Sequence, residues 1–163
     1  MGPNLPKASA RKAAVPAWLG LLVITCALGS RSLAADQPGP APKADEPQTV
    51  VVVGDSLAVG YGLEPAQAFP ALLQEKIDGL GWKFSVVNAG LSGDTSAGGL
   101  RRIDWLLKRR IDVLLLELGG NDGLRGISPE ATKTNLQTTI DRAKKKYPRV
   151  RIIIAGMQMP PNM

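Results

Sequence analysis

The chain has 163 residues, of which 44% are hydrophobic and 21% are charged, a composition typical of one globular domain. Its net charge of +6 is unevenly spread, because no acidic residue precedes Asp36, whereas Lys7, Arg11, Lys12 and Arg31 do. The rest of the chain holds 16 basic and 14 acidic residues and so carries only about +2. The basic balance is therefore poor support for nucleic-acid binding.

The first 35 residues predict a secretory signal peptide. Basic residues between positions 7 and 12 precede an apolar run at 13–29. Ser-Leu-Ala-Ala at 32–35 then supplies small residues where a signal peptidase cleaves. We expect cleavage after Ala34 or Ala35, which would leave a periplasmic or secreted protein.

Two alternatives to cleavage are weaker. The apolar run is shorter than the ~20 residues of a spanning helix and contains a proline and two glycines, which disfavours a retained membrane anchor. Lipid attachment at Cys26 is disfavoured because Thr25 is larger than the residue expected before such a cysteine. Cys26 is the only cysteine and the chain has no histidine, so we expect no disulfide, metal or cofactor in the mature protein.

Residues 36–48 predict an extended linker, because prolines there alternate with glycine, alanine and charged residues. Residues 49–163 are expected to form one domain in which apolar stretches alternate with helical patterns. The predicted strands are 50–53, 84–88, 113–118 and 150–155.

Three predicted helices separate these strands. They begin at Glu64, at one of the capping residues 94–96, and at Ser128. The residues expected to face the sheet are Phe69, Leu72, Leu73, Ile77 and Leu80, then Leu100, Ile103, Leu106 and Leu107, then Leu136, Ile140 and Ala143. The residues expected to point outward from the second helix are Arg101, Arg102, Lys108 and Arg109.

Strands that are apolar on both faces and alternate with helices predict an α/β fold. Such strands form a parallel sheet with right-handed crossovers and helices on both sides. The functional site is expected in the loops at the carboxyl ends of the strands. Three loops follow successive strands and contain Ser56, Gly93 and Asn121.

Ser56 is the candidate nucleophile. It follows a β-branched strand and the dipeptide Gly-Asp, so its hydroxyl is expected at the mouth of the sheet. Its backbone N–H would open a helical turn, where the helix dipole stabilises a developing negative charge. The alternative is an ordinary strand-to-helix turn in which Ser56 caps the helix.

Gly93 and Asn121 are candidate donors to the oxyanion of a tetrahedral intermediate. Gly93 has no side chain, so its backbone N–H can approach a ligand closely. The side-chain amide of Asn121 could donate to the same oxygen. The alternatives are that Gly93 only fits a tight turn and that Asn121 only caps a loop.

The acidic residues near these loops are expected to be structural. Asp94 is expected to be the N-cap of the following helix, and Asp55 and Asp122 are expected to brace their own loops through backbone amides. Glu117 lies near the end of a buried strand and should therefore have a partner.

Three blocks of sequence resemble those of the GDSL, or SGNH, hydrolase family. They are Gly-Asp-Ser-Leu at 54–57, Asn-Ala-Gly-Leu-Ser-Gly-Asp-Thr-Ser at 88–96, and Glu-Leu-Gly-Gly-Asn-Asp-Gly-Leu-Arg-Gly at 117–126. They are most similar to the bacterial periplasmic branch of arylesterases, acyl-CoA thioesterases and lysophospholipases. The resemblance implies a flavodoxin-like three-layer sandwich. It also implies that Ser56 is the nucleophile and that its N–H, Gly93 and Asn121 form the oxyanion hole.

One block of that family has no counterpart here. The family carries Asp-x-x-His near its carboxyl end, whereas this chain has no histidine. The resemblance therefore implies a domain that is incomplete at its C-terminus, corresponding to the first two-thirds of the enzyme. We expect at most residual activity and a marginally stable, aggregation-prone domain.

Three classes of function compete. The first is hydrolysis of small-molecule esters, thioesters or lysophospholipids, with membrane contact only through the signal peptide during export. The second is an acyl-ligand-binding module without catalysis, or the product of a decaying gene. A nucleotide-binding domain is weaker, because the glycine-rich phosphate-binding motifs are missing. Tyr61, Leu91 and Leu124 flank the candidate loops and line either the pocket or the core.

Overall fold

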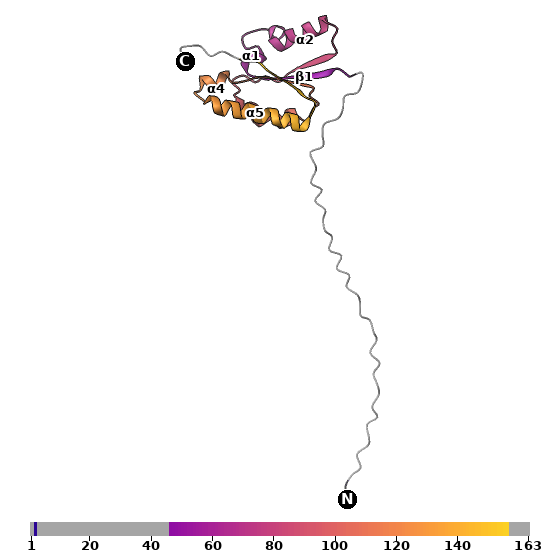
Figure 1. Cartoon of the computed structure of the whole chain (residues 1–163), viewed down its shortest axis with the longest axis vertical. Helices are drawn as coiled ribbons and strands as arrows, with labels where there is room; N and C mark the ends of the chain where they lie inside the picture. The colour runs from indigo at the N-terminus through magenta and orange to yellow at the C-terminus, as the bar shows by residue number, and fades with distance from the viewer. Residues whose placement is uncertain (1, 3–45, 157–163) are drawn as a thin grey trace. The chain divides into compact units, whose positions relative to one another are not determined.

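The computed structural model describes residues 2 and 46–156, so the predicted signal peptide and most of the linker lie outside the described residues. Residues 46–156 contain one parallel sheet (Figure 1). Its strands are β1 (Gln48–Gly54), β2 (Phe84–Asn88), β3 (Val113–Glu117) and β4 (Arg151–Ile154), in the spatial order β2-β1-β3-β4. The four predicted strands and the parallel α/β class are confirmed.

The two central strands bring the candidate loops together. β1 and β3 run side by side, with Val50 opposite Val113 and Gly54 opposite Glu117. β1 pairs with β2 on its other side, so all three strands end at one edge of the sheet. β3 is buried along its whole length, as the continuous apolar run predicts for a strand covered on both faces.

Helices cover both faces of the sheet (Figure 1). The helices are α1 (Ser56–Val59), the 3-10 turn η1 (Pro65–Gln67), α2 (Phe69–Gly79), α3 (Ser96–Leu106), α4 (Gly120–Leu124) and α5 (Pro129–Lys146). α3 and α5 pack through Ile103, Leu106 and Ile140 against one face of β1 and β3. α1 and α2 cover part of the opposite face, where Ala58, Phe69 and Leu73 pack around Val52 and Leu115.

The predicted helix from Glu64 is interrupted. A 3-10 turn ends at Gln67, Ala68 is extended, and α2 begins at Phe69 with Pro70 in its first turn. Proline has no N–H to continue the earlier turn, and it fits the first turn of a new helix. The predicted apolar face of this helix is also too wide: Phe69, Leu73 and Ile77 pack inward, whereas Leu72 and Leu80 are exposed.

The uncovered part of the sheet lies around β4. This strand ends the strand order, so its outer edge has no paired strand within the described residues. Ile153 and Ile154 are 49% and 58% exposed. Within residues 46–156, no helix is both long enough and apolar enough to cross a lipid bilayer.

Candidate active site

The turn between β1 and α1 places Ser56 at the carboxyl edge of the sheet. Asp55 is the N-cap of α1, and Ser56 is the first residue of that helix. A side chain at Gly54 would put its Cβ 2.6 Å from both Ala58 Cβ and Glu117 Oε2, so the turn needs glycine there. Ser56 is half-buried, and Asp55, rather than Ser56, caps the helix.

Asp55 connects the nucleophile turn to the loop that carries Asn121. Its Oδ1 accepts a hydrogen bond from the backbone N–H of Leu57 at 3.0 Å, which confirms that it braces its own loop. Its Oδ2 accepts from Asn121 Nδ2 at 2.9 Å. The carboxylate therefore fixes the position of the Asn121 amide relative to Ser56. This contact was not predicted from the sequence, because Asp55 and Asn121 are 66 positions apart.

Three N–H groups on these loops are available to an anion. The backbone N–H groups of Ser56 and Gly93 donate to no other group within residues 46–156. Asn121 Nδ2 has two hydrogens, and one of them goes to Asp55. Gly93 has a positive φ of 76°, which favours glycine, and its carbonyl accepts from Arg125 Nη2 at 2.9 Å. These groups suit the stabilisation of an oxyanion.

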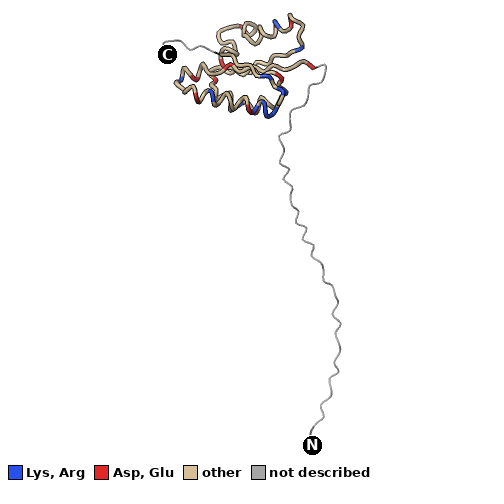
Figure 2. Tube along the Cα trace, viewed as in Figure 1, with Lys and Arg blue, Asp and Glu red and all other residues tan. Residues whose placement is uncertain are grey.

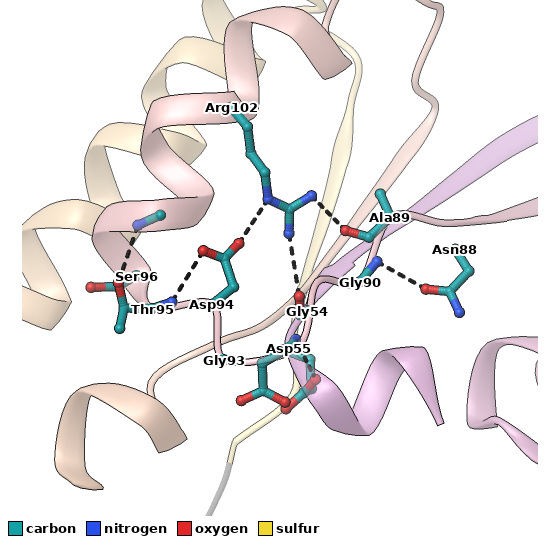
Figure 3. A network of polar contacts seen from close by, with 12 residues as sticks. Gly54, Asp55, Asn88, Ala89, Gly90, Gly93, Asp94, Thr95, Ser96 and Arg102 are labelled. Atoms are coloured by element: carbon teal, nitrogen blue, oxygen red, sulfur yellow. Dashed lines mark hydrogen bonds and ion pairs between the residues drawn. The ribbon is translucent and has the colours of Figure 1, made fainter. Parts of the chain in front are cut away.

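Asp94 is not the N-cap of α3, contrary to the sequence-based prediction. Thr95 takes that place, and its hydroxyl accepts from the backbone N–H of Gly98 at 3.2 Å. Asp94 Oδ2 instead receives a hydrogen bond from Arg102 Nε at 2.7 Å (Figure 3). The ion pair draws the carboxylate toward the guanidinium and leaves the cap to the next residue.

Arg102 also departs from its prediction, since it does not point into solvent. Its guanidinium donates to the carbonyls of Ala89 and Gly54, the latter at 3.2 Å, and to Asp94 (Figure 3). It thereby ties the end of β1 to the loop that precedes Gly93. The sequence indicates only weakly that Arg102 is partly buried, namely by its position directly before the inward-facing Ile103.

Asp122 braces a neighbouring element rather than its own loop. It is 1% exposed, and its carboxylate accepts from the backbone N–H of Ser96 at 2.8 Å and from the Ser96 hydroxyl. Thr132 Oγ1 of α5 donates to it at 3.1 Å. Asn135 donates to Ser96 Oγ at 3.0 Å, which completes a buried network between α3, α4 and α5. This network holds the loops of Gly93 and Asn121 at a fixed separation.

Glu117 supports the nucleophile turn from beneath, as expected of a structural acid with a partner. Its Oε2 accepts from the backbone N–H of Asp55 at 3.2 Å. Glu117 is only 6% exposed, and its Oε1 has no hydrogen-bond partner within the described residues. Burial raises the pKa of the carboxyl, an effect that the Asp55 N–H opposes and the Asp55 charge reinforces.

Several apolar side chains near these residues in the sequence are exposed. Tyr61, Leu91 and Leu124 are exposed, so they are not core residues. Leu57 directly follows Ser56 and is exposed as well. Exposed apolar groups beside a polar centre are suited to contact an acyl chain.

The site contains a nucleophile and anion-stabilising donors but no evident base. No side chain within residues 46–156 accepts a hydrogen bond from Ser56 Oγ, and the chain has no histidine. The described part also holds no group of three metal-ligating side chains. The described residues therefore include candidate donors for an oxyanion, and they do not explain how the Ser56 proton is removed.

Comparisons with known proteins identify the family of this chain. Residues 52–163 match the GDSL-like Lipase/Acylhydrolase family. Esterase TesA of Pseudomonas aeruginosa is 43% identical over 116 residues, which cover 71% of this chain and 57% of that protein. "Thioesterase 1/protease 1/lysophospholipase L1" of Escherichia coli K12 is 46% identical over 97 residues, 59% of this chain and 45% of that protein.

Solved structures show the same architecture. The crystal structure of TesA matches with a TM-score of 0.68 over 71% of this chain and 63% of that chain. AlinE4, an SGNH-hydrolase family esterase, is 36% identical and matches with a TM-score of 0.68 over 74% of this chain and 64% of that one. The chain thus spans less than two-thirds of the length of these relatives.

Proposed function

Because the chain belongs to the GDSL-like lipase/acylhydrolase family, we propose that its site is that of a serine hydrolase acting on carboxylic esters or thioesters. The observation that supports the proposal is a set of three donors at the carboxyl edge of the sheet, namely the Ser56 N–H, the Gly93 N–H and the Asn121 amide that contacts Asp55. Small-molecule esters, thioesters and lysophospholipids are the proposed substrates. Nucleic acid is not among the proposed partners.

In the proposed reaction, Ser56 Oγ attacks the acyl carbonyl and forms a tetrahedral intermediate. The carbonyl oxygen gains the negative charge and is stabilised by the three donors. The C–O or C–S bond then breaks, the alcohol or thiol leaves, and water hydrolyses the acyl-serine ester. Because no histidine is present to take the serine proton, the chain as given is proposed to retain only a residual rate, about 10³ to 10⁴-fold above water.

A chromogenic ester assay on the purified chain tests the proposal. Asn121→Ala is expected to lower the residual turnover by about 10² to 10³-fold, because it removes one oxyanion donor. Ser56→Ala is expected to change the residual turnover little, because without a base this rate comes from the oxyanion donors and substrate binding. Ser128→Ala, at the cap of α5, should leave turnover unchanged and serves as the control. Turnover that is unaffected by Asn121→Ala, or that reaches ordinary enzymatic rates, contradicts the proposal.

A second candidate is an acyl-ligand-binding module without catalysis. The exposed apolar groups near Ser56 and the lack of histidine favour it. Titration with a lysophospholipid, followed by calorimetry, separates the two candidates. Saturable binding with no Asn121-dependent product supports the binding module, whereas Asn121-dependent product formation supports the hydrolase.

The location of the protein is also a proposal. The signal-peptide pattern in residues 1–35 supports a periplasmic or secreted protein after cleavage at Ala34 or Ala35. Mass spectrometry of the protein recovered from cells tests this. A mature N-terminus near Asp36 is expected, and an intact leader on the recovered protein would contradict it.

A further inference from the structure

Basic side chains gather at one end of the folded domain. The segments 107–112 and 142–151 hold nine Lys and Arg residues and one acidic residue, Asp112. They include the connections from α3 to β3 and from α5 to β4, so they lie at the amino ends of the strands, opposite the candidate site. Figure 2 shows the cationic residues at this end of α5.

Direct contacts hold the two segments side by side. The buried Tyr147 hydroxyl lies 2.8 Å from the carbonyl oxygen of Arg109 and 3.2 Å from that of Leu107. The charges therefore form one continuous surface, which we call the basic end. Its exposed cationic residues are Lys108, Arg109, Arg142, Lys144, Lys145, Arg149 and Arg151.

Carboxylates pair with Arg142 and Arg110 within this surface. Asp104 Oδ2 pairs with Arg142 Nη1 at 2.7 Å, and Asp112 Oδ1 pairs with Arg110 Nη2 at 2.9 Å. Cations in the last turn of α5 also compensate the negative end of the helix dipole. Arg149 lies beyond α5, so compensation of the helix dipole does not account for its positive charge.

An exposed tryptophan adjoins the basic end. Trp105 is 63% exposed on α3, although the same helix buries Ile103 and Leu106 in the core. Lys108 lies in the turn that ends this helix, where its backbone N–H donates to the Trp105 carbonyl at 3.2 Å. Tryptophan beside lysine and arginine is a combination favoured at the interface between water and lipid.

The preceding part of the chain joins the domain at this same end. β1 begins at Gln48, whose Oε1 accepts a hydrogen bond from Arg151 Nη2 at 2.8 Å. Arg151 of the basic end is therefore held at the start of β1.

We propose that the basic end is a docking surface for a membrane of anionic phospholipids. The cationic side chains contact the headgroup phosphates, and Trp105 enters the interface between headgroups and acyl chains. This orientation turns Ser56 away from the bilayer and toward dissolved substrates. The inference goes beyond the proposed hydrolase function, because docking needs no reaction at Ser56.

Tryptophan fluorescence of the full chain tests the proposal. Trp18→Phe and Trp82→Phe leave Trp105 as the only tryptophan of three. This protein is titrated with vesicles of phosphatidylcholine alone or mixed with phosphatidylglycerol, each containing a brominated phospholipid as quencher. We expect a blue shift and quenching with the anionic vesicles, both reversed by added salt, and neither with the neutral ones.

Two matched double variants isolate the basic end from the leader. Lys108→Gln with Lys144→Gln is expected to weaken the affinity for anionic vesicles about fivefold per lysine removed. Lys76→Gln with Lys133→Gln removes two exposed lysines elsewhere and should leave that affinity unchanged. Equal losses in both variants overturn the proposal, as does equal quenching by neutral vesicles. A Trp105 response to an RNA or DNA oligonucleotide, without a response to vesicles, also overturns it.

Discussion

Arg102 joins three parts of the chain that shape the candidate site. Its guanidinium contacts Asp94, the carbonyl of Ala89 and the carbonyl of Gly54. The Asp94 side chain is 6% exposed and that of Arg102 is 21% exposed, so solvent screens this pair less than a surface ion pair. Removing the arginine would leave the buried Asp94 carboxylate without its ion-pair partner and the Ala89 carbonyl without its guanidinium donor. The Gly54 carbonyl would keep the bond from the Leu91 N–H.

Arg102→Met is expected to lower the free energy of unfolding by about 2–3 kcal/mol, because charge-assisted hydrogen bonds are lost. Denaturant unfolding followed by circular dichroism measures the change. Arg101→Met removes an exposed neighbouring arginine and should change stability by less than about 0.5 kcal/mol. Similar losses in the two variants would show that the contacts of Arg102 do not stabilise the fold.

Glu117 gives the stability of the domain a pH dependence. Burial raises the pKa of its carboxyl in the folded state, so the folded protein holds this proton more tightly than the unfolded chain. The contribution of Glu117 to the free energy of unfolding is fully present below the unfolded pKa of about 4.3. It is lost as pH rises through the folded pKa. The bond from the Asp55 N–H can be kept by a glutamine oxygen.

Glu117→Gln is therefore expected to flatten the fall in stability as pH rises from about 4.3 toward neutral. Urea unfolding at a series of pH values measures this slope. Glu75→Gln, at an exposed position of α2, controls for the change in net charge. An unchanged slope in Glu117→Gln would rule out this residue as its source.

At the scale of single elements, the ion pair between Asp94 and Arg102 determines which residue caps α3. Thr95 caps the helix because Asp94 is held by Arg102. The helix begins directly after the Gly93 loop, so its first turn sets the direction in which that loop leaves the sheet. The cap is therefore part of the support of the oxyanion donors.

Thr95→Ala is expected to cost about 1 kcal/mol of stability, whereas Thr95→Ser keeps a capping hydroxyl and should lose little. Thermal unfolding of the three proteins in parallel measures the difference. If Asp94 could take over as the cap, Thr95→Ala and Thr95→Ser would unfold at the same temperature. That result would contradict the assignment of Thr95.

At the scale of the whole molecule, the sheet is well covered around β1 and β3 and poorly covered around β4. On one face, a hollow of about 590 Å³ is lined by Val113, Leu115 and Ile153. On the other face, a hollow of about 530 Å³ is lined by Leu136, Ile154 and other residues. An apolar, unpaired strand edge within the described residues favours association with other chains.

Ile153→Lys is expected to reduce concentration-dependent association, because a charge on an outer strand opposes edge-to-edge pairing. Sedimentation velocity over a range of protein concentrations measures the effect. Leu124→Lys adds the same charge at an exposed apolar residue of α4, away from β4. If both variants reduce association equally, net charge rather than the β4 edge is responsible.

The amino-acid sequence by itself determined the alternation of strands and helices, the parallel sheet and the three loops at its carboxyl edge. These features follow from local patterns, since apolar runs and capping residues act over a few neighbouring positions. The buried runs at Val50–Val53 and Val113–Leu116 became the central strands as predicted. Ser56, Gly93 and Asn121 follow the carboxyl ends of β1, β2 and β3 as predicted, but Ser56 and Asn121 lie in the short helices α1 and α4 rather than in loops.

Only the tertiary structure decided the partners of the polar side chains. Arg102 is paired with Asp94 instead of pointing into solvent, and Thr95 rather than Asp94 caps α3. Asp122 accepts a hydrogen bond from the backbone N–H of Ser96. Asp55 binds Asn121 although 66 positions separate them. A charged side chain is paired with whichever group burial brings within hydrogen-bond distance. That choice depends on the packing of distant segments, which no local pattern encodes.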